Sequence, residues 1–229
     1  MSLPAALSER TLATLSDALG TTSTEELALT SPMSPEPVGS LRVLRGGPID
    51  KIVSVSLVVP RIGLDSHMIF AFTGSDSPCP HFTLDSVSSP EFHAMHLDLV
   101  PRVDLAVHLD YLDEVFVPLT PLLESAWTID GISPAAIGPR QRALMSPWML
   151  VCRATPEAFK ALDDTVDAYL EHWLALVREG VTEVDADLVG RDRANRANLF
   201  DPRVDPVWEQ VTRLIGAEQS ERVRGELLA

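Results

Sequence analysis

The chain has 229 residues, 45% of them hydrophobic, and a net charge of -15, which suffices for one large single-core domain and argues against nucleic acid and anionic membrane surfaces as partners. No apolar run reaches the roughly 20 residues that a membrane helix needs, and the N-terminal sequence lacks the basic start and continuous apolar core of a secretory signal. Two cysteines without metal-ligand spacing predict reduced thiols in a cytoplasmic protein.

The N-terminal region is predicted to be a helix followed by an irregular segment. Leucines recur at helical spacing over residues 4–20, and Gly20 is suited to end the helix. Residues 21–40 are rich in Thr, Ser and Pro, which predicts a loop or linker. We therefore expect a helix and loop over residues 1–40 and a single domain over residues 41–229.

A series of β-type runs follows this segment. Apolar and polar residues alternate in them, which is the period-2 signal of strands with one buried face. The turns between consecutive runs are short, and such spacing predicts an antiparallel meander. The runs are Leu41–Arg45, Ile49–Val59, Ser66–Phe72, Phe82–Val87 and Phe92–Leu99.

Helical patterns dominate the second half of the chain. The longest apolar stripe spans residues 156–179, where Thr155 is placed to cap the helix and Pro156 occupies the favoured first position. Strands first and helices later favour an α+β layer fold. Shorter predicted elements are a helix around Tyr111, a helical turn at Leu122–Trp127, a strand at Met149–Cys152, and helices at 184–198 and 206–228.

The sequence lacks the common signatures of nucleophilic, phosphate-binding and nucleotide-binding sites. No Gly-x-Ser-x-Gly elbow, phosphate-binding loop or dinucleotide glycine fingerprint is present. His93 and His96 are expected to point to opposite faces of one strand, so a metal shared between them is not expected. Asp98 follows on that strand, and Arg102 is a candidate to pair with it.

Three protonatable side chains stand out. Asp is depleted in strands, and Asp85 would lose its hydration if it pointed inward from its run. His67 lies on the preceding run and can face Asp85 if the two strands are antiparallel neighbours, although a hydrogen-bonded core histidine is the plain alternative. Asp205 directly precedes Pro206, and the local sequence alone favours a helix N-cap there.

Several short motifs resemble the plant red chlorophyll catabolite reductases, which are grouped with the ferredoxin-dependent bilin reductases. The most extended is His-Leu-Asp-Leu-Val-Pro-Arg at 96–102, and Val-Asp-Pro at 204–206 is similar to the C-terminal Asn-Asp-Pro segment of the bilin reductases. The resemblance spans about residues 41–229. Further matches are Gly-Pro-Ile-Asp at 47–50, Tyr-Leu at 111–112, Ser-Pro at 146–147, Tyr-Leu-Glu-His-Trp-Leu at 169–174 and Arg-Asp at 191–192.

This resemblance implies a fold and an activity. The family has a three-layer α/β/α sandwich around a central, mostly antiparallel sheet, and its substrate lies between the sheet and the C-terminal helices. It uses no bound metal or flavin: reduced ferredoxin supplies single electrons, and side chains supply protons to a linear tetrapyrrole. The implied function is ferredoxin-dependent reduction of a biliverdin-type bilin or of red chlorophyll catabolite.

The resemblance also implies roles for individual residues. Asp85 matches a carboxylate on the central strand, which is Glu in the plant chlorophyll-catabolite enzymes. His67 matches a histidine of the biliverdin reductases that make phycocyanobilin, which the plant enzymes lack. Asp205 matches the C-terminal acid, with Asp201 as the alternative if the alignment contains a gap. Candidates to hold the two propionates, because guanidinium groups match carboxylates, are Arg61, Arg102, Arg153 and Arg203.

The partner and the exact role stay open at this stage. Ferredoxins are acidic, so a docking face on this acidic chain has to be locally basic, for example around Arg42, Arg45 and Lys51. Two other functions are compatible with the fold: a bilin- or haem-binding protein without turnover, and an interaction module that has lost the pocket. The resemblance does not decide which tetrapyrrole is used or whether the chain forms a homodimer.

Overall fold

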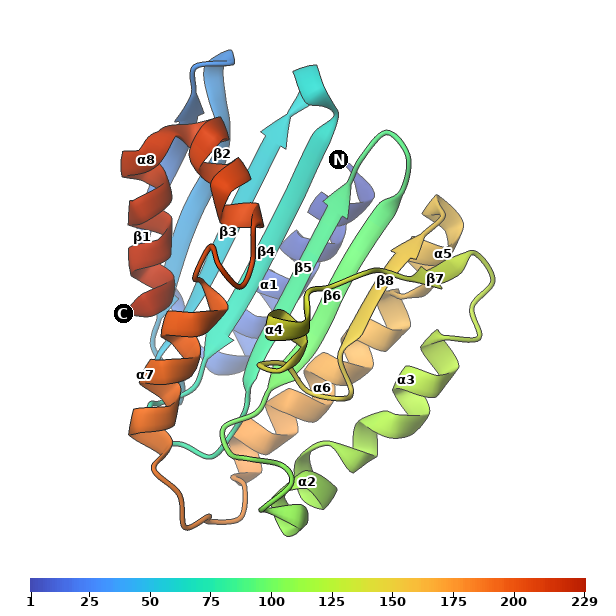
Figure 1. Cartoon of the computed structure of the whole chain (residues 1–229), viewed down its shortest axis with the longest axis vertical. Coiled ribbons are helices and arrows are strands. Elements are labelled where there is room, and N and C mark those ends of the chain that lie inside the picture. Colours follow the sequence, from blue (N-terminus) through green and yellow to red (C-terminus); the bar gives the residue numbers. More distant parts are fainter.

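An eight-stranded antiparallel sheet forms the centre of the computed structural model, which describes residues 1–229 (Figure 1). Each of the first five strands pairs with the next one along the chain, so the predicted meander is confirmed. In sheet order the strands are β1 (Thr22–Ser31), β2 (Ser34–Arg45), β3 (Lys51–Val59), β4 (Leu64–Phe72), β5 (His81–Ser88), β6 (His93–Val100), β8 (Leu150–Ala154) and β7 (Ile132–Pro134).

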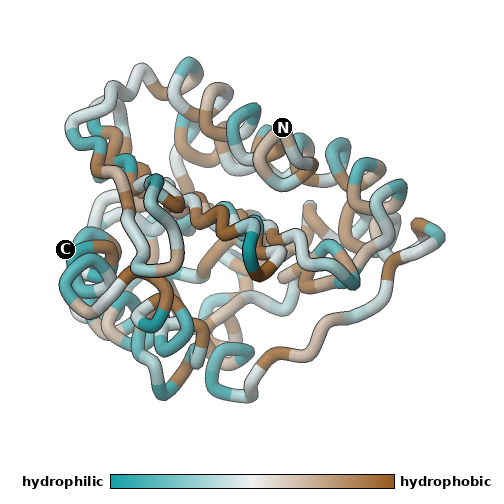
Figure 2. The backbone as a smooth tube through the Cα atoms, turned by 90° about the horizontal axis from the view of Figure 1, so that it is seen from above, coloured by the Kyte–Doolittle hydropathy of each residue, from teal (hydrophilic) through white to brown (hydrophobic).

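Helices cover both faces of this sheet, which confirms the predicted α/β/α sandwich (Figures 1 and 2). One face is covered by α1 (Leu3–Leu19), α2 (Leu109–Val115), α3 (Thr120–Ala126), α5 (Pro156–Ala161) and α6 (Asp163–Glu179). The other lies under α7 (Leu188–Leu199), α8 (Val207–Leu228) and the short α4 (Pro139–Arg142). Single 3-10 turns lie at Pro60–Ile62 and Val117–Leu119.

The two apolar clusters follow from the alternation within the strands. On β4, Ile69 and Ala71 belong to the cluster under α1 and α6, whereas Phe70 and Phe72 belong to the cluster under α7 and α8. Both sheet faces are therefore buried over the centre of the sheet. No helix combines the length and the apolar character that crossing a membrane requires.

The expected loop at residues 21–40 is wrong, because most of it lies in β1 and β2. The two strands pair regularly from Glu25↔Val43 to Leu29↔Gly39. β2 begins to pair with β3 only at Gly39, so the prolines at 35 and 37 precede the stretch in which β2 is paired on both sides. Proline is tolerated at such a sheet edge. β2 also runs without a break across the boundary that was expected between residues 40 and 41.

Most predicted helices are present. The hydroxyl of Thr155 accepts a hydrogen bond from the backbone N–H of Ala158 (3.2 Å), as expected of the cap. The expected single helix over residues 156–179 is divided at Leu162 into α5 and α6. Trp173 on α6 is completely buried and donates its indole N–H to the carbonyl of Pro80 (2.7 Å), which ties this helix to the sheet.

Candidate active site

The register of the central strands places Asp85 in a row of side chains on one sheet face. Asp85 on β5 lies opposite Met68 on β4 and opposite His96 on β6. Directly opposed residues of antiparallel strands project on the same side with Cβ atoms about 5 Å apart. This face, which we call the Asp85 face, is the one covered by α7 and α8.

Two small adjoining hollows lie at this row, with volumes of about 70 and 60 Å³. Met68, Asp85, Val207 and Trp208 line both of them. Oδ1 of Asp85 and Nε2 of His96 are buried there without a hydrogen-bond partner. Buried polar atoms are nearly always paired in native proteins, so the two unpaired atoms at this hollow leave hydrogen-bonding capacity that a ligand can use.

The surroundings shift the pKa values of both side chains away from their ordinary ranges. Burial raises the pKa of Asp85 to about 7, and the nearby charge of Asp205 acts in the same direction. Burial lowers the pKa of His96 to about 4. At neutral pH the imidazole is therefore uncharged while the carboxyl group is still partly protonated. A carboxyl group in this state can donate a proton at physiological pH.

Asp205 approaches the same hollow from the N-terminal end of α8. Its Oδ1 accepts a hydrogen bond from the backbone N–H of Val207 (3.0 Å), so the capping contact suggested by the sequence is present. Burial raises the pKa of Asp205. The alternative acid, Asp201, instead accepts hydrogen bonds from Nε of Arg203 (3.0 Å to each oxygen) and does not line the hollow.

His67 does not face Asp85, so that geometrical expectation is wrong. His67 lies opposite Ser86, one position away from the Met68–Asp85 pair, and therefore points to the other side of the sheet. Its Nε2 lies 2.7 Å from Oδ1 of Asp65. It thus corresponds to the plain alternative of a hydrogen-bonded histidine.

His96, and not the predicted His67, is the histidine next to Asp85. The hairpin register accounts for this pairing. Ser88 pairs with His93 beside the turn, so the residues three positions further from the turn on each strand, Asp85 and His96, also pair. His93 and His96 do point to opposite faces, as expected from their spacing.

The four candidate arginines are dispersed, and none lines the two hollows. Arg61 is exposed in a 3-10 turn, and Arg203 is exposed and paired with Asp201. Arg102 is completely buried and donates to Oγ1 of Thr73 (3.0 Å).

Arg153 alone among the four lies on the sheet beside the Asp85 row. The pairings Ser66↔Val87, Val87↔Ala94 and Ala94↔Arg153 place it in the next row of side chains on the Asp85 face. The residues of this row are partly or fully exposed. The face therefore continues from the hollow toward an exposed guanidinium group.

Asp98 is a second buried carboxyl group on the Asp85 face. It accepts hydrogen bonds from the backbone N–H (2.9 Å) and the hydroxyl (2.5 Å) of Ser146, and the expected pairing with Arg102 is wrong. Burial raises the pKa of Asp98 to about 7, although the two bonds from Ser146 oppose that shift.

Comparison with known proteins agrees with this architecture. No family model matches the chain. Over 199 residues it is 24% identical to red chlorophyll catabolite reductase of Hordeum vulgare, which covers 76% of this chain and 92% of that protein. Over 85 residues it is 36% identical to the chloroplastic red chlorophyll catabolite reductase 1 of Oryza sativa subsp. japonica, a match that covers 34% of this chain and 26% of the rice protein.

The fold matches that of phytochromobilin synthase from tomato, solved in complex with biliverdin. The TM-score is 0.70 at 16% sequence identity, and the match covers 94% of this chain and 79% of the tomato protein. The resemblance to the red chlorophyll catabolite reductase and bilin reductase family is confirmed. The sequence relatives and the structural relative thus come from the two branches that the motifs indicated.

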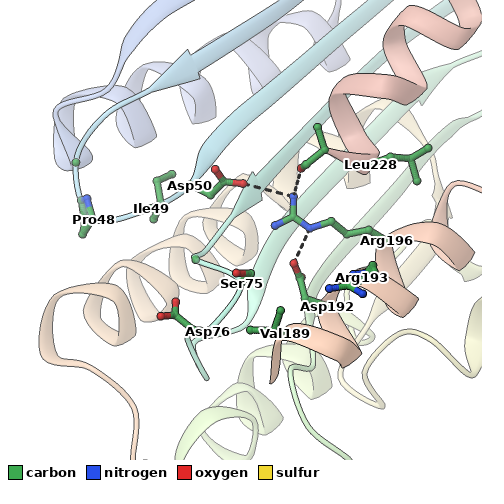
Figure 3. Close-up of a pocket in the computed structure, with 13 residues that line it drawn as sticks. Pro48, Ile49, Asp50, Ser75, Asp76, Val189, Asp192, Arg193, Arg196 and Leu228 are labelled. Atoms are coloured by element: carbon green, nitrogen blue, oxygen red, sulfur yellow. Dashed lines mark hydrogen bonds and ion pairs between the residues drawn. The ribbon is translucent and has the colours of Figure 1, made fainter. Parts of the chain in front are cut away.

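A larger recess of about 650 Å³ lies away from Asp85, between the β2–β3 turn, the β4–β5 turn, α7 and the end of α8 (Figure 3). Its central charged groups are paired: Arg196 donates to Asp192 (3.0 Å) and to the carbonyl of Ala229 (2.9 Å), and lies 3.5 Å from Asp50. We place the active site at the smaller hollows, because the buried Oδ1 of Asp85 and Nε2 of His96 are unpaired there and the pKa of Asp85 lies near neutral pH.

The basic face expected around Arg42, Arg45 and Lys51 is not formed. Arg42 pairs with Glu9 (2.7 Å) and Arg45 lies 3.4 Å from Asp50. Lys51 is completely buried. These cations are thus neutralised or inaccessible, and an acidic partner has to dock elsewhere.

Proposed function

We propose that the chain reduces a linear tetrapyrrole, either a biliverdin-type bilin or red chlorophyll catabolite, with external reduced ferredoxin as the electron donor. The observation that carries the proposal is the carboxyl group of Asp85, whose buried Oδ1 is unpaired and whose pKa is about 7, at an apolar hollow beneath the C-terminal helices. The similarity to red chlorophyll catabolite reductases and the fold shared with phytochromobilin synthase support it.

The chemistry requires a proton donor of this kind. Reducing one double bond adds two electrons and two protons, and ferredoxin delivers its electrons one at a time. The first electron makes the tetrapyrrole more basic, so that it can take the proton of Asp85. A flat apolar ligand lying over Asp85 would remove further water from the carboxyl group and keep it protonated.

We assign Asp205 to the opposite side of the substrate and His96 to the Asp85 side. Asp205 lines the same hollow as Asp85, and its free oxygen can accept hydrogen bonds from pyrrole N–H groups. His96, uncharged at neutral pH, can accept or donate one hydrogen bond to the substrate. The position of His67 on the other sheet face gives no support to a catalytic role for it.

The substrate has to extend beyond the two hollows. Sites for small molecules are typically about 300–1,000 Å³, whereas the hollows measure about 70 and 60 Å³. The row that contains Arg153 is the open continuation of the same face. Arg153 is therefore our choice for a propionate group, and the positions of Arg61, Arg102 and Arg203 do not support that role.

Both substrate classes are to be tested, and we expect biliverdin to be accepted. Asp rather than Glu at position 85 favours it, and the structural relative was solved with biliverdin. The sequence relatives favour the chlorophyll catabolite. If only the chlorophyll catabolite reacts, the identity of the acid at position 85 does not determine the substrate.

The decisive experiment adds each tetrapyrrole to the purified protein, then reduced ferredoxin, and follows the absorption spectrum. A shift on binding followed by a second change on reduction is the expected result. A shift without the second change would indicate a binding protein that does not turn over its ligand. No shift with any tetrapyrrole would indicate an interaction module.

A further inference from the structure

A two-electron reduction consumes two protons, and one carboxyl group holds only one. This inference rests on the proposed function, because it concerns the origin of the second proton. The same sheet face carries a second carboxyl group near Asp85: Asp98 is completely buried and does not line either hollow.

The sheet brings Asp98 close to Asp85 through one intervening side chain. Asp98 follows His96 by two positions on β6, so both point to the Asp85 face. Asp98 is a diagonal neighbour of Asp85 across the β5–β6 pair, a separation of about 7–8 Å that a ring side chain can span. His96 is that ring, and no hydrogen bond holds its buried Nε2.

The groups around Asp98 include no cation. Thr83 lies opposite it on β5, Ser146 donates to it from the segment before β8, and Tyr169 on α6 is near. A buried carboxylate without a cation is costly. If the role of Asp98 were only to hold the Ser146 turn, asparagine would supply the acceptor without that cost.

We propose that Asp98 is the second proton donor of the site and that its proton reaches Asp85 through His96. The first electron and the proton of Asp85 leave a one-electron-reduced, singly protonated tetrapyrrole and an ionised Asp85. That negative charge favours protonation of the adjacent imidazole. His96 then takes a proton from Asp98 on one ring nitrogen and releases one to Asp85 from the other. After the second electron, Asp85 donates again.

The protonation of Asp98 can be measured without turnover. Infrared difference spectra of the protein, without any tetrapyrrole, should show two carboxylic acid C=O bands below neutral pH, both fading as the pH rises through about 7. Asp85→Asn should remove one band and Asp98→Asn the other. Ser146→Ala removes the hydroxyl that donates to ionised Asp98, so the pKa of Asp98 should rise and its band should stay visible to higher pH. This variant tests the assignment even if Asp98→Asn does not fold.

Single-turnover experiments locate the step. With reduced ferredoxin in excess, Asp85→Asn should stall before the first protonation, whereas Asp98→Asn and His96→Gln should accumulate the singly protonated intermediate. Its decay should slow by about a hundredfold, the lower end of what a positioned proton donor contributes. His93→Gln is the matched control, because His93 lies on the same strand with its side chain on the other face.

The outcomes separate this inference from the proposed function. If Asp98 stays ionised below neutral pH, the second-donor role is overturned while tetrapyrrole reduction is left intact. The same holds if the singly protonated intermediate decays as fast in the Asp98→Asn variant as in the wild type. A wild-type protein that reduces no tetrapyrrole would overturn both.

Discussion

Asp85 and Asp192 are both acids on the side of the sheet covered by α7 and α8, and their surroundings give them opposite properties. Burial alone would raise the pKa of Asp192, but a hydrogen bond with His81 and the charges of Arg102 and Arg196 lower it to about 2. Asp85 has no such partners, and its pKa rises to about 7. Asp192 is thus a fixed anion that holds α7 to the sheet, whereas Asp85 can exchange a proton.

Substitution of Asp85 tests its chemical role directly. Asp85→Asn keeps the shape of the side chain but cannot donate an acidic proton. We expect tetrapyrrole binding, followed as the absorption shift, to be retained and reduction to slow or to stop at a radical. A variant that turned over at the wild-type rate would remove Asp85 from the mechanism.

The raised pKa of Asp85 also predicts how stability depends on pH. In the unfolded chain the group ionises near its ordinary pKa, so between that value and about 7 the folded state binds the extra proton. Stability that depends on this proton is present at low pH and is lost as the pH rises through about 7. We therefore expect Asp85→Asn to raise the melting temperature relative to wild type at about pH 8 and to change it little at about pH 4. An equal shift at both pH values would contradict this.

Asp205 is a cap, and the proposal makes it a substrate ligand as well. Asparagine caps about as well as aspartate, so Asp205→Asn should leave the melting temperature nearly unchanged. Loss of the charge that faces the substrate should lower affinity or turnover by about tenfold, the equivalent of about 1.4 kcal/mol.

Asp201→Asn is the control for Asp205, since Asp201 is engaged by Arg203 away from the hollow. Its turnover should match the wild type. Loss of activity in the Asp201 variant alone would mean that the C-terminal acid of the family corresponds to Asp201.

At the scale of elements, the sequence predicts best where side-chain period and burial agree. The strands from β3 to β6 and the helix α6 were predicted because their apolar residues recur at the strand or helix period. The strand β1 and the first half of β2 were predicted as a loop, because Thr, Ser and Pro indicate loops, whereas Leu41–Arg45 in the second half of β2 was predicted as a strand. β1 is an edge strand, which needs only one partner, and the prolines of β2 precede its pairing with β3.

The site residues also differ in how far the sequence predicts them. Asp85 stands out as an acid within a strand, and hairpin counting would have found His96. The approach of Asp205 depends on how α7 and α8 pack on the sheet, which no local pattern encodes.

The register of β4 against β5 leads to an expectation for His67. Because its ring points away from Asp85, His67→Ala should leave both KM and kcat unchanged. It should lower the stability of the fold by about 1 kcal/mol or more through loss of the hydrogen bond to Asp65. Turnover and thermal unfolding of the same variant check this, and a fall in kcat without a loss of stability would return His67 to the mechanism.

At the scale of the whole molecule, charge is distributed unevenly. No Asp or Glu occurs from residue 131 to 156, although the chain carries a net charge of -15. This acid-free segment includes α4, whose Gln141 lines the hollow at Asp85. Arg140 and Arg142 are exposed, and Arg140 donates to the carbonyl of Arg203 rather than to a carboxylate. An acidic electron donor would thus meet a basic surface directly above the site.

We expect Arg140→Glu/Arg142→Glu to weaken reduction by ferredoxin. At low salt kcat/KM for ferredoxin should fall by about tenfold or more, and the difference from wild type should shrink at high salt. Reduction by a small artificial donor should not change. Lys160→Glu/Arg178→Glu, the same change in charge on α5 and α6 across the sheet, is the control. An equal loss in both double variants would place docking elsewhere.

The two halves of the site are held by contacts of very different range along the chain. Asp85 and His96 belong to one hairpin, so their juxtaposition requires the closure of only a short loop. Asp205 comes from the far end of the chain and is held by the packing of the segment between α7 and α8. Local opening of that segment would uncover Asp85 without separating β5 from β6. Amide hydrogens of residues 200–208 should accordingly exchange faster than those of the hairpin, and the same opening gives a bulky ligand its way in.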